Sequence, residues 1–488
     1  MKDRLFQKAG TALIWRAVQL AGVKVIFMLR LLILARLLSP EDFGLLAIAV
    51  TAVGFLLGVT DIGMIPALVQ GRDVDEQQYN AAWTVGVTRA LLVVGCVVVA
   101  APLIAKIFAE PRATDIIRVL AIRPLLDAAA SIEIADLTRN LQFRSLAVLK
   151  LVEALTNTTV SIALASTFGV WALVAGTLAG SASYLVTSYL VAPHRPRLSF
   201  NRHATGPLIR FGRWIFLTSL IVMAGSYVLR VVISRQLGAA ELGLYFLAAQ
   251  LAFLPAELSS EVIGSVAFPL FARLQSNILQ VTQAFRTILT GISALFFPVC
   301  TLTIALAPTL VQDLLGPKWA GTVPVIRILT LVSMIGLFGE VAVPILKGLG
   351  QPYKVTVIEM VQSLLLIAGV WFLTSRYGLV GAALAWLPAM VVSQIVGMRF
   401  VQQLLERPFA GLGGPLLAIT VASVAGAVVA LLVDNLVSGL PGLVIATLVA
   451  VLTIGVLLWA SDRRFALGLR NEFVRILPQI AVFMGYSP

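Results

Sequence analysis

Residues 11–35 read TALIWRAVQLAGVKVIFMLRLLILA, an apolar run interrupted by three cations, Arg16, Lys24 and Arg30. A helix needs about 20 mostly apolar residues to cross the hydrocarbon core of a bilayer, so this segment predicts a membrane-spanning helix. The run is too long for the apolar part of a signal peptide, and no small-residue cleavage site follows it. We therefore interpret it as a span that the protein retains.

Composition extends this interpretation to the whole chain. Of its 488 residues 59% are hydrophobic and 12% are charged, and the mean hydropathy is +0.98. Soluble domains carry about 25% charged residues, so a water-soluble fold is excluded. The sequence predicts an all-α polytopic membrane protein with fourteen spans, at about 11–35, 43–68, 82–108, 117–137, 146–166, 170–192, 214–234, 243–267, 287–311, 322–345, 355–375, 378–400, 412–432 and 440–460.

Lysine and arginine are distributed unevenly between the two sides of these spans. One side carries 22 of the 36 cations, the other carries six, and eight lie within spans. Lys150, at the start of the fifth predicted span, is counted with the richer side. Cytoplasmic loops hold the excess of positive charge, so both termini are predicted to be cytoplasmic. The net charge of +13 then reflects topology, and no nucleic-acid partner is expected.

The chain repeats itself at offsets of about 200 residues. Arg36-x-Leu38-x3-Asp42-x-Gly44-Leu45 returns as Arg235-x-Leu237-x3-Glu241-x-Gly243-Leu244, Ile117-Arg118-Val119-Leu120 as Ile326-Arg327-Ile328-Leu329, and Phe168-Gly169-Val170 as Tyr377-Gly378-Leu379. An even number of spans per half makes the halves parallel, related by an axis along the membrane normal. The repeat predicts an N-terminal six-helix lobe at 1–192, a basic linker at 193–213, a second six-helix lobe at 214–400, and two further helices with a tail at 401–488.

Charges inside spans are the candidate functional residues, because each costs about 2.5–3.5 kcal/mol at the bilayer centre. At about 100° per residue, Arg16, Lys24 and Arg30 fall within an arc of about 120°, a basic stripe suited to a cavity that accepts an anion. Alternatively, Arg16 and Arg30 extend to opposite interfaces, and Lys24 is paired with an acid. The other candidate anion-binding cations are Arg89, Arg118, Arg123, Arg230 and Arg327.

Acidic residues in spans are candidates for ion coupling. Glu257 and Glu261 share a helix face just after Pro255; left unpaired, they would suit a proton or cation relay, and the alternative is that they pair with cavity cations. Arg123 and Asp127 are spaced as an i, i+4 pair and are expected to neutralise each other. The remaining candidates for ion coupling are Asp61 and Glu340.

The glycine motifs, the two cysteines and the two histidines are not expected to form a chemical site. Gly54-x3-Gly58 and Gly176-x3-Gly180 are expected to allow close helix packing. Cys96 and Cys300 lie in apolar runs and are expected to pack as small hydrophobic residues. The only histidines, His194 and His203, lie in the predicted linker. No catalytic residue, metal site or cofactor is predicted.

Several motifs resemble those of a known family. Leu34-Ala35-Arg36-Leu37-Leu38-Ser39-Pro40-Glu41-Asp42-Phe43-Gly44-Leu45, Asp61-Ile62-Gly63 and Ala67-Leu68-Val69-Gln70 resemble the polysaccharide transporter family, the lipopolysaccharide and O-antigen flippase branch of the multidrug/oligosaccharidyl-lipid/polysaccharide superfamily. Over residues 10–400 the resemblance also rests on Phe168-Gly169-Val170-Trp171-Ala172-Leu173, Phe268-Pro269-x3-Arg273-Leu274-Gln275, Gly316-x2-Trp319 and Leu349-Gly350-Gln351-Pro352.

The resemblance implies a monomeric transport unit in the bacterial inner membrane, with two lobes around an alternately opening cavity. Its substrate would be undecaprenyl-pyrophosphate-linked oligosaccharide, and its partners membrane lipids, a polymerase and other polysaccharide-assembly proteins. Basic residues of the first span in related flippases meet the pyrophosphate, which makes Arg16, Lys24 and Arg30 candidates for that role. The alternatives are an ion-coupled multidrug exporter of the same superfamily, which would need a cavity suited to cations, and a membrane enzyme such as a polymerase or ligase, which would need a larger external loop.

Overall fold

The computed structural model describes residues 2–60, 76–140, 142–193, 196–199, 220–221, 223–275, 277–437 and 439–465, with side chains described from Trp15 onward. Several predictions fall outside these ranges. They concern Asp61, both histidines, and most of the predicted linker and C-terminal tail.

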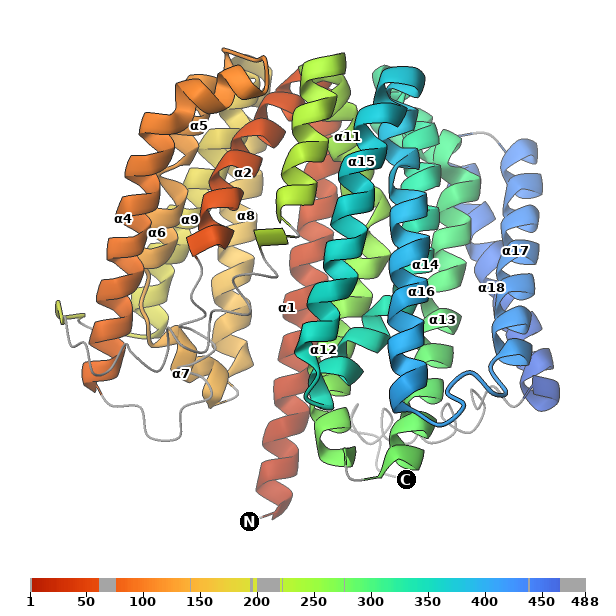
Figure 1. Cartoon of the computed structure of the whole chain (residues 1–488). Coiled ribbons are helices and arrows are strands. Elements are labelled where there is room, and N and C mark those ends of the chain that lie inside the picture. Colours follow the sequence, from red (N-terminus) through yellow and green to blue (C-terminus); the bar gives the residue numbers. More distant parts are fainter. Residues whose placement is uncertain are drawn as a thin grey trace. The chain divides into compact units, whose positions relative to one another are not determined.

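The chain divides into two compact units, Met1–Phe246 and Leu247–Pro488. This division follows contacts, whereas the predicted lobes follow the sequence repeat, so the lobe boundaries stay a prediction. Residues 223–237 of unit 1 are also helical. The elements of unit 1 are α1 (Lys2–Leu37), α2 (Pro40–Thr60), α4 (Glu76–Ile107), α5 (Ala113–Leu120), α6 (Arg123–Ala129), α7 (Ile134–Arg139), α8 (Phe143–Phe168), α9 (Val170–Val191) and the first part of α11 (Ala239–Ala252) (Figure 1).

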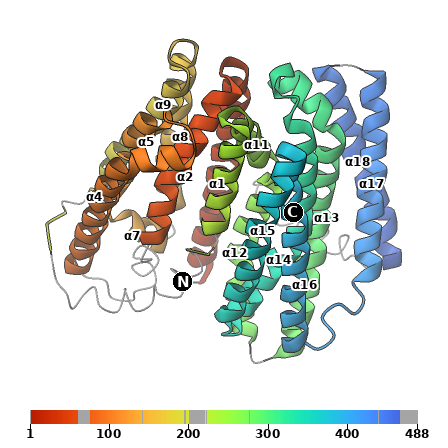
Figure 2. The same ribbon diagram turned by 45° about the horizontal axis from the view of Figure 1, so that its top comes forward.

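Unit 2 continues from α11 and is helical as well. Within it α17 and α18 lie side by side in both views (Figures 1 and 2). Its apolar core is formed largely by α12, α13, α14, α17 and α18. Its elements are α12 (Leu254–Leu274), α13 (Ile278–Thr309), the π-helix Leu310–Leu315, the 3-10 turn Pro317–Trp319, α14 (Thr322–Gly348), α15 (Pro352–Leu384), α16 (Trp386–Leu404), α17 (Gly413–Leu436) and α18 (Leu440–Phe465).

The protein is all-α in the described residues and is a multi-pass membrane protein. Among the residues that the structure describes, ten helices are long and apolar enough to cross a membrane, or eleven if the bent pair α11 and α12 is one span, so the predicted number of fourteen is not confirmed. Of the other three predicted spans, 117–137 is broken into α5, α6 and α7, and 378–400 begins inside α15 and continues as α16. The third, 214–234, lies partly outside the described residues.

The predicted repeat reappears as a repeated backbone conformation. Gly169, between α8 and α9, has φ 53° and ψ −128°, and Gly378, inside α15, has φ 59° and ψ −139°. These angles are readily adopted by glycine alone. The two residues are the centres of Phe168-Gly169-Val170 and Tyr377-Gly378-Leu379, so both copies of this motif make the same sharp turn.

The two copies of the first motif also contact each other, within unit 1. A methyl carbon at Gly44 of α2 would lie 1.8 Å from the carbonyl oxygen of Ala239, and one at Gly243 of α11 would lie 1.7 Å from that of Pro40. Pro40 and Ala239 are equivalent in the repeat, so the contact is reciprocal. Each copy of the motif therefore places its glycine against the backbone of the other copy.

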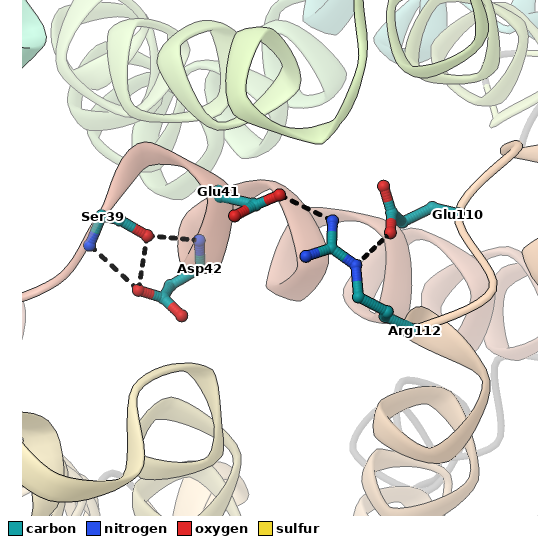
Figure 3. A network of polar contacts seen from close by, with 5 residues as sticks. All are labelled: Ser39, Glu41, Asp42, Glu110 and Arg112. Carbon is teal, nitrogen blue, oxygen red and sulfur yellow. Dashed lines mark hydrogen bonds and ion pairs between the residues drawn. The ribbon is translucent and has the colours of Figure 1, made fainter.

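Residues 39–42 explain why α2 begins where it does. Ser39 and Asp42 form a capping box: the Ser39 backbone N–H donates to the Asp42 carboxylate at 2.9 Å, and the Asp42 backbone N–H donates to the Ser39 hydroxyl at 3.2 Å (Figure 3). Pro40 occupies the first helical position, where its missing N–H has no cost. The second carboxylate oxygen of Asp42 accepts from the backbone N–H of Val170 at 2.9 Å, so Asp42 also joins the start of α2 to the start of α9.

Arg112 joins the same end of α2 to the connection between α4 and α5. Its guanidinium donates to Glu41 and to Glu110, both at 2.6 Å (Figure 3). Hydrogen bonds to Glu110 and then to Glu41 raise the pKa of Arg112. The side chains of Arg112 and Glu41 are 56% and 47% exposed, so solvent screens this pair, and it contributes little to stability.

Alanine at Gly44 is expected to destabilise the protein. The added methyl group meets a backbone carbonyl that cannot move by itself, and overpacking of this kind costs about 1–3 kcal/mol. Gly54→Ala is the matched control, because a methyl group there meets nothing within 4 Å and alanine favours a helix by about 0.8–1 kcal/mol over glycine. Thermal denaturation in detergent measures the midpoints of the two purified variants. Equal midpoints would contradict the close contact at Gly44.

Loss of the Asp42 carboxylate is also expected to lower the thermal midpoint. Asp42→Ala removes both the cap and the bond to Val170, and a cap alone contributes about 0.5–2 kcal/mol. The neighbouring Glu41→Ala removes only an exposed ion pair, which contributes about 0–1 kcal/mol. If the two variants melt at the same temperature, the capping account of Asp42 is wrong.

Candidate functional site

The basic face of α1 packs along α8. The Arg16 guanidinium lies 5.9 Å from the centre of the Phe143 ring, and Arg30 donates to the Asn157 side-chain oxygen. The fourteen-residue step on α1 matches a fourteen-residue step on α8, so the two helices run parallel. Arg16 and Arg30 therefore share the face that meets α8. Fourteen residues at 1.5 Å each separate them by about 21 Å, so one phosphate cannot reach both.

A cavity of about 220 Å³ lies between α1 and α8. Arg30 and Phe27 line it from α1, and Lys150, Glu153 and Asn157 line it from α8. Lys150 pairs with Glu153 at 2.9 Å. We call this space the α1–α8 cavity. Two cations and one carboxylate line it. Polar groups of α8 already accept some of the hydrogen bonds that each cation can donate.

A second cavity of about 320 Å³ lies among α4, α6, α7 and α9, and we call it the Trp83 cavity. Much of its wall is small and apolar, including Ala82, Gly86 and Ala128. Its polar lining residues are Trp83, Arg89, Asp127, Ser131, Thr138 and Tyr184.

Tyr184 of α9 connects the two cavities. It lines the Trp83 cavity, and its ring centre lies 4.2 Å from the ammonium group of Lys150, which lines the α1–α8 cavity. Its hydroxyl is within electrostatic reach of Glu153 and then of Asp127, one carboxylate from each cavity. One aromatic ring therefore contacts Lys150 of the α1–α8 cavity and forms part of the wall of the Trp83 cavity.

Close packing of α9 on α8 holds this arrangement. A methyl carbon at Gly176 would lie 2.7 Å from the carbonyl oxygen of Asn157, and one at Gly180 would lie 3.2 Å from that of Glu153. The Gly176-x3-Gly180 motif is thus a packing motif, as predicted, and it brings α9 against the residues of α8 that line the cavity. In the other motif, Gly58 contacts Met223, whereas Gly54 faces open space.

Four of the predicted candidates meet around these cavities. Arg30 lines the α1–α8 cavity, and Arg89 and Asp127 line the Trp83 cavity. Arg123 pairs with Asp127 at 3.4 Å, which confirms the predicted i, i+4 pair, and lies within electrostatic reach of Arg30. Arg89 also donates to the carbonyl oxygen of Thr60 at 3.1 Å.

Other candidates in unit 1 lie away from both cavities. Arg118 is exposed and pairs with Asp115 at 3.1 Å. Arg230 donates to the Thr51 hydroxyl at 2.8 Å, which joins helical residues 223–237 to α2. Lys24 is half-buried on α1, six residues or about 9 Å from Arg30.

In unit 2 the predicted candidates are spread over three helices. Glu257 and Glu261 lie on an exposed face of α12. Glu340 of α14 is half-buried and lies close to Ser260 of α12. Arg327 is exposed and donates to the carbonyl oxygen of Ile304 at 3.1 Å. Whether any of the four takes part in ion coupling or anion binding stays a prediction.

Sequence analysis missed most of the α8 wall. Lys150 was counted with the cations of the richer side and was not among the candidate site residues, yet it is the eighth residue of α8 and lines the cavity. Lys150, Glu153 and Asn157 follow a spacing of three and four residues, which marks one helix face. This polar face within an apolar span was the available signal. Tyr184 and Trp83 carry no comparable signal.

Comparison with known proteins assigns the chain to a family. The family described as "Polysaccharide biosynthesis protein" matches residues 33–324. The chain is 29% identical to the succinoglycan biosynthesis transport protein ExoT of Rhizobium meliloti over 65% of each chain, slightly less than two thirds of that relative. It is 22% identical to the lipopolysaccharide biosynthesis protein WzxC of Escherichia coli over 78% of each chain.

Two solved structures share the fold. The lipid II flippase MurJ in an inward closed conformation superposes with a TM-score of 0.76 at 14% identity, covering 93% of this chain and 100% of MurJ. An inward-facing multidrug resistance MATE transporter superposes with a TM-score of 0.60 at 16% identity, covering 80% of this chain and 97% of its own. The fold is therefore that of the superfamily to which these transporters belong, and the chain is a member of the polysaccharide biosynthesis protein family.

Proposed function

We propose that the chain is a flippase that moves undecaprenyl-pyrophosphate-linked oligosaccharide from the inner to the outer leaflet of a bacterial inner membrane. The observation that carries the proposal is the α1–α8 cavity, where Arg30 and Lys150 lie inside a membrane protein whose family serves polysaccharide biosynthesis. Transport by alternating access, cytoplasmic termini and partnership with a polymerase belong to the same proposal.

A pyrophosphate needs such groups to leave water. A cation about 4 Å from a phosphate contributes about 4 kcal/mol at an effective dielectric of about 20, so two cations offset much of the desolvation cost. The polyprenyl tail remains in lipid, because only the head group requires the protein. Lys24, on the same helix, is the third cation we assign to this path.

The cavity disfavours the alternative of a multidrug exporter. Organic cations need carboxylates and aromatic surfaces, whereas Arg30 and Lys150 outnumber the one carboxylate of the α1–α8 cavity. Resistance of producing cells to cationic dyes tests this alternative, and a rise in resistance would support it over the flippase.

Arg30→Ala and Lys150→Ala are each expected to reduce export at least about tenfold, and Lys24→Ala to a smaller extent. Each loss removes an attraction of more than about 1.4 kcal/mol, which corresponds to a factor of ten. The measurement is surface polysaccharide restored in a deletion strain, together with the lipid-linked glycan that accumulates on the inner leaflet. That glycan also identifies the substrate.

Arg376→Ala is the matched control, because Arg376 is exposed and rests on the Phe372 ring of its own helix. All variants are compared at equal protein level in the membrane. Normal export by the Arg30→Ala, Lys150→Ala double variant would refute the proposed anion site.

A further inference from the structure

The Trp83 cavity differs in chemistry from the α1–α8 cavity. Its two charged lining residues are one acid, Asp127, and one base, Arg89. Asp127 is paired with Arg123, and Arg89 is held by the carbonyl oxygen of Thr60. The lining residues thus carry one acid and one base, whereas two bases and one acid line the α1–α8 cavity, and the other polar groups that they offer are neutral hydrogen-bonding groups.

An aromatic surface accompanies these polar groups. Trp83 is half-buried, and its indole N–H is shielded from solvent and makes no hydrogen bond of ordinary geometry. The Tyr189 hydroxyl lies near the indole and donates to the carbonyl oxygen of Ala129 at 2.8 Å, and its oxygen is the nearest protein acceptor for the indole N–H, although not in ordinary hydrogen-bond geometry. A ligand in the cavity would thus give the indole N–H a better-placed acceptor than the protein does.

Sugars are the ligands that match this combination. A pyranose has apolar C–H faces that stack on aromatic rings, and hydroxyl groups that accept from arginine and indole and donate to carboxylate. A volume of about 320 Å³ is at the lower end of the range of small-molecule sites, about 300–1,000 Å³. It suits about one or two sugar rings and excludes a folded polymer.

The position of the cavity supports the same ligand. Tyr184 is the wall that the Trp83 cavity shares with the Lys150 ammonium of the α1–α8 cavity. In a lipid-linked saccharide the first sugar is bonded directly to the phosphate, so a site for one must adjoin a site for the other. The two cavities of unit 1 have this arrangement.

We infer that the Trp83 cavity is a carbohydrate subsite, which binds the sugar proximal to the phosphate by stacking on Trp83 and by hydrogen bonds to Asp127, Arg89 and Tyr184. The inference rests on the proposed flippase function and adds the part of the substrate that the second cavity recognises. The ligand class is a neutral hexose or N-acetylhexosamine.

Binding of synthetic probes to protein in nanodiscs tests the inference. The probes are farnesyl pyrophosphate without sugar, and the same lipid carrying glucose, galactose or N-acetylglucosamine. We expect at least one sugar to tighten binding to the wild-type protein about tenfold or more. Trp83→Ala and Asp127→Asn should each remove most of that gain, and should leave binding of the sugar-free probe within about twofold.

Trp371→Ala is the matched control, because Trp371 is a tryptophan on α15 with 65% of its surface exposed; it should keep the full gain. Trp83→Phe, which keeps an aromatic ring and removes the donor, replaces Trp83→Ala if the latter does not fold, and should lose part of the gain. If the sugar-free probe binds and no sugar improves its affinity, or if the variants keep the gain, the sugar subsite is refuted. If neither kind of probe binds the wild-type protein, the proposed flippase function is refuted with it.

Discussion

A positive charge is stable inside a membrane protein only where the protein supplies the polar partners that water supplies elsewhere. In unit 1 those partners come from α8, whose Asn157 accepts from Arg30 and whose Glu153 pairs with Lys150. These contacts depend in turn on how closely α9 approaches α8. Gly176 and Gly180 permit that approach. Gly169 makes the sharp turn that lets α9 pack antiparallel to α8. The candidate site is a consequence of this helix pair.

The turn between α8 and α9 is also held by residues of the repeated motif. Asp42 caps α2 and accepts from Val170 at the start of α9. Gly44 lets α2 meet α11. Motifs that identify the family by sequence therefore have structural roles at helix ends, which explains why they predict the fold well and the substrate poorly. The groups that line the cavities lie outside those motifs.

This separation determines what the sequence could predict. The helical membrane fold and the pairing of Arg123 with Asp127 follow from hydropathy and helix periodicity, which are local properties, and the repeat follows from motifs that recur in the sequence. The number of spans was less predictable, because the break of residues 117–137 into three short helices leaves the apolar composition unchanged. Lys150 was not selected as a candidate because a cation near a span end resembles a loop residue until a partner such as Tyr184 is known. Contacts of that kind join residues 34 positions apart, and a single sequence carries no record of them.

The internal pairing of the cavity charges also bears on how a flippase could work. A guanidinium without a protein partner in this cavity would hold a pyrophosphate too tightly to release it. After release it would be left desolvated and without a hydrogen-bond acceptor, which makes the empty state costly. Here Asn157 contacts Arg30 and Glu153 contacts Lys150. Binding of a pyrophosphate therefore exchanges these contacts for contacts with the phosphate groups. Exchange keeps the free-energy difference between the loaded and empty states small. Transport requires a small difference, because a carrier has to release on one side what it captured on the other. In our proposal the mixed charge of the α1–α8 cavity is therefore what allows turnover.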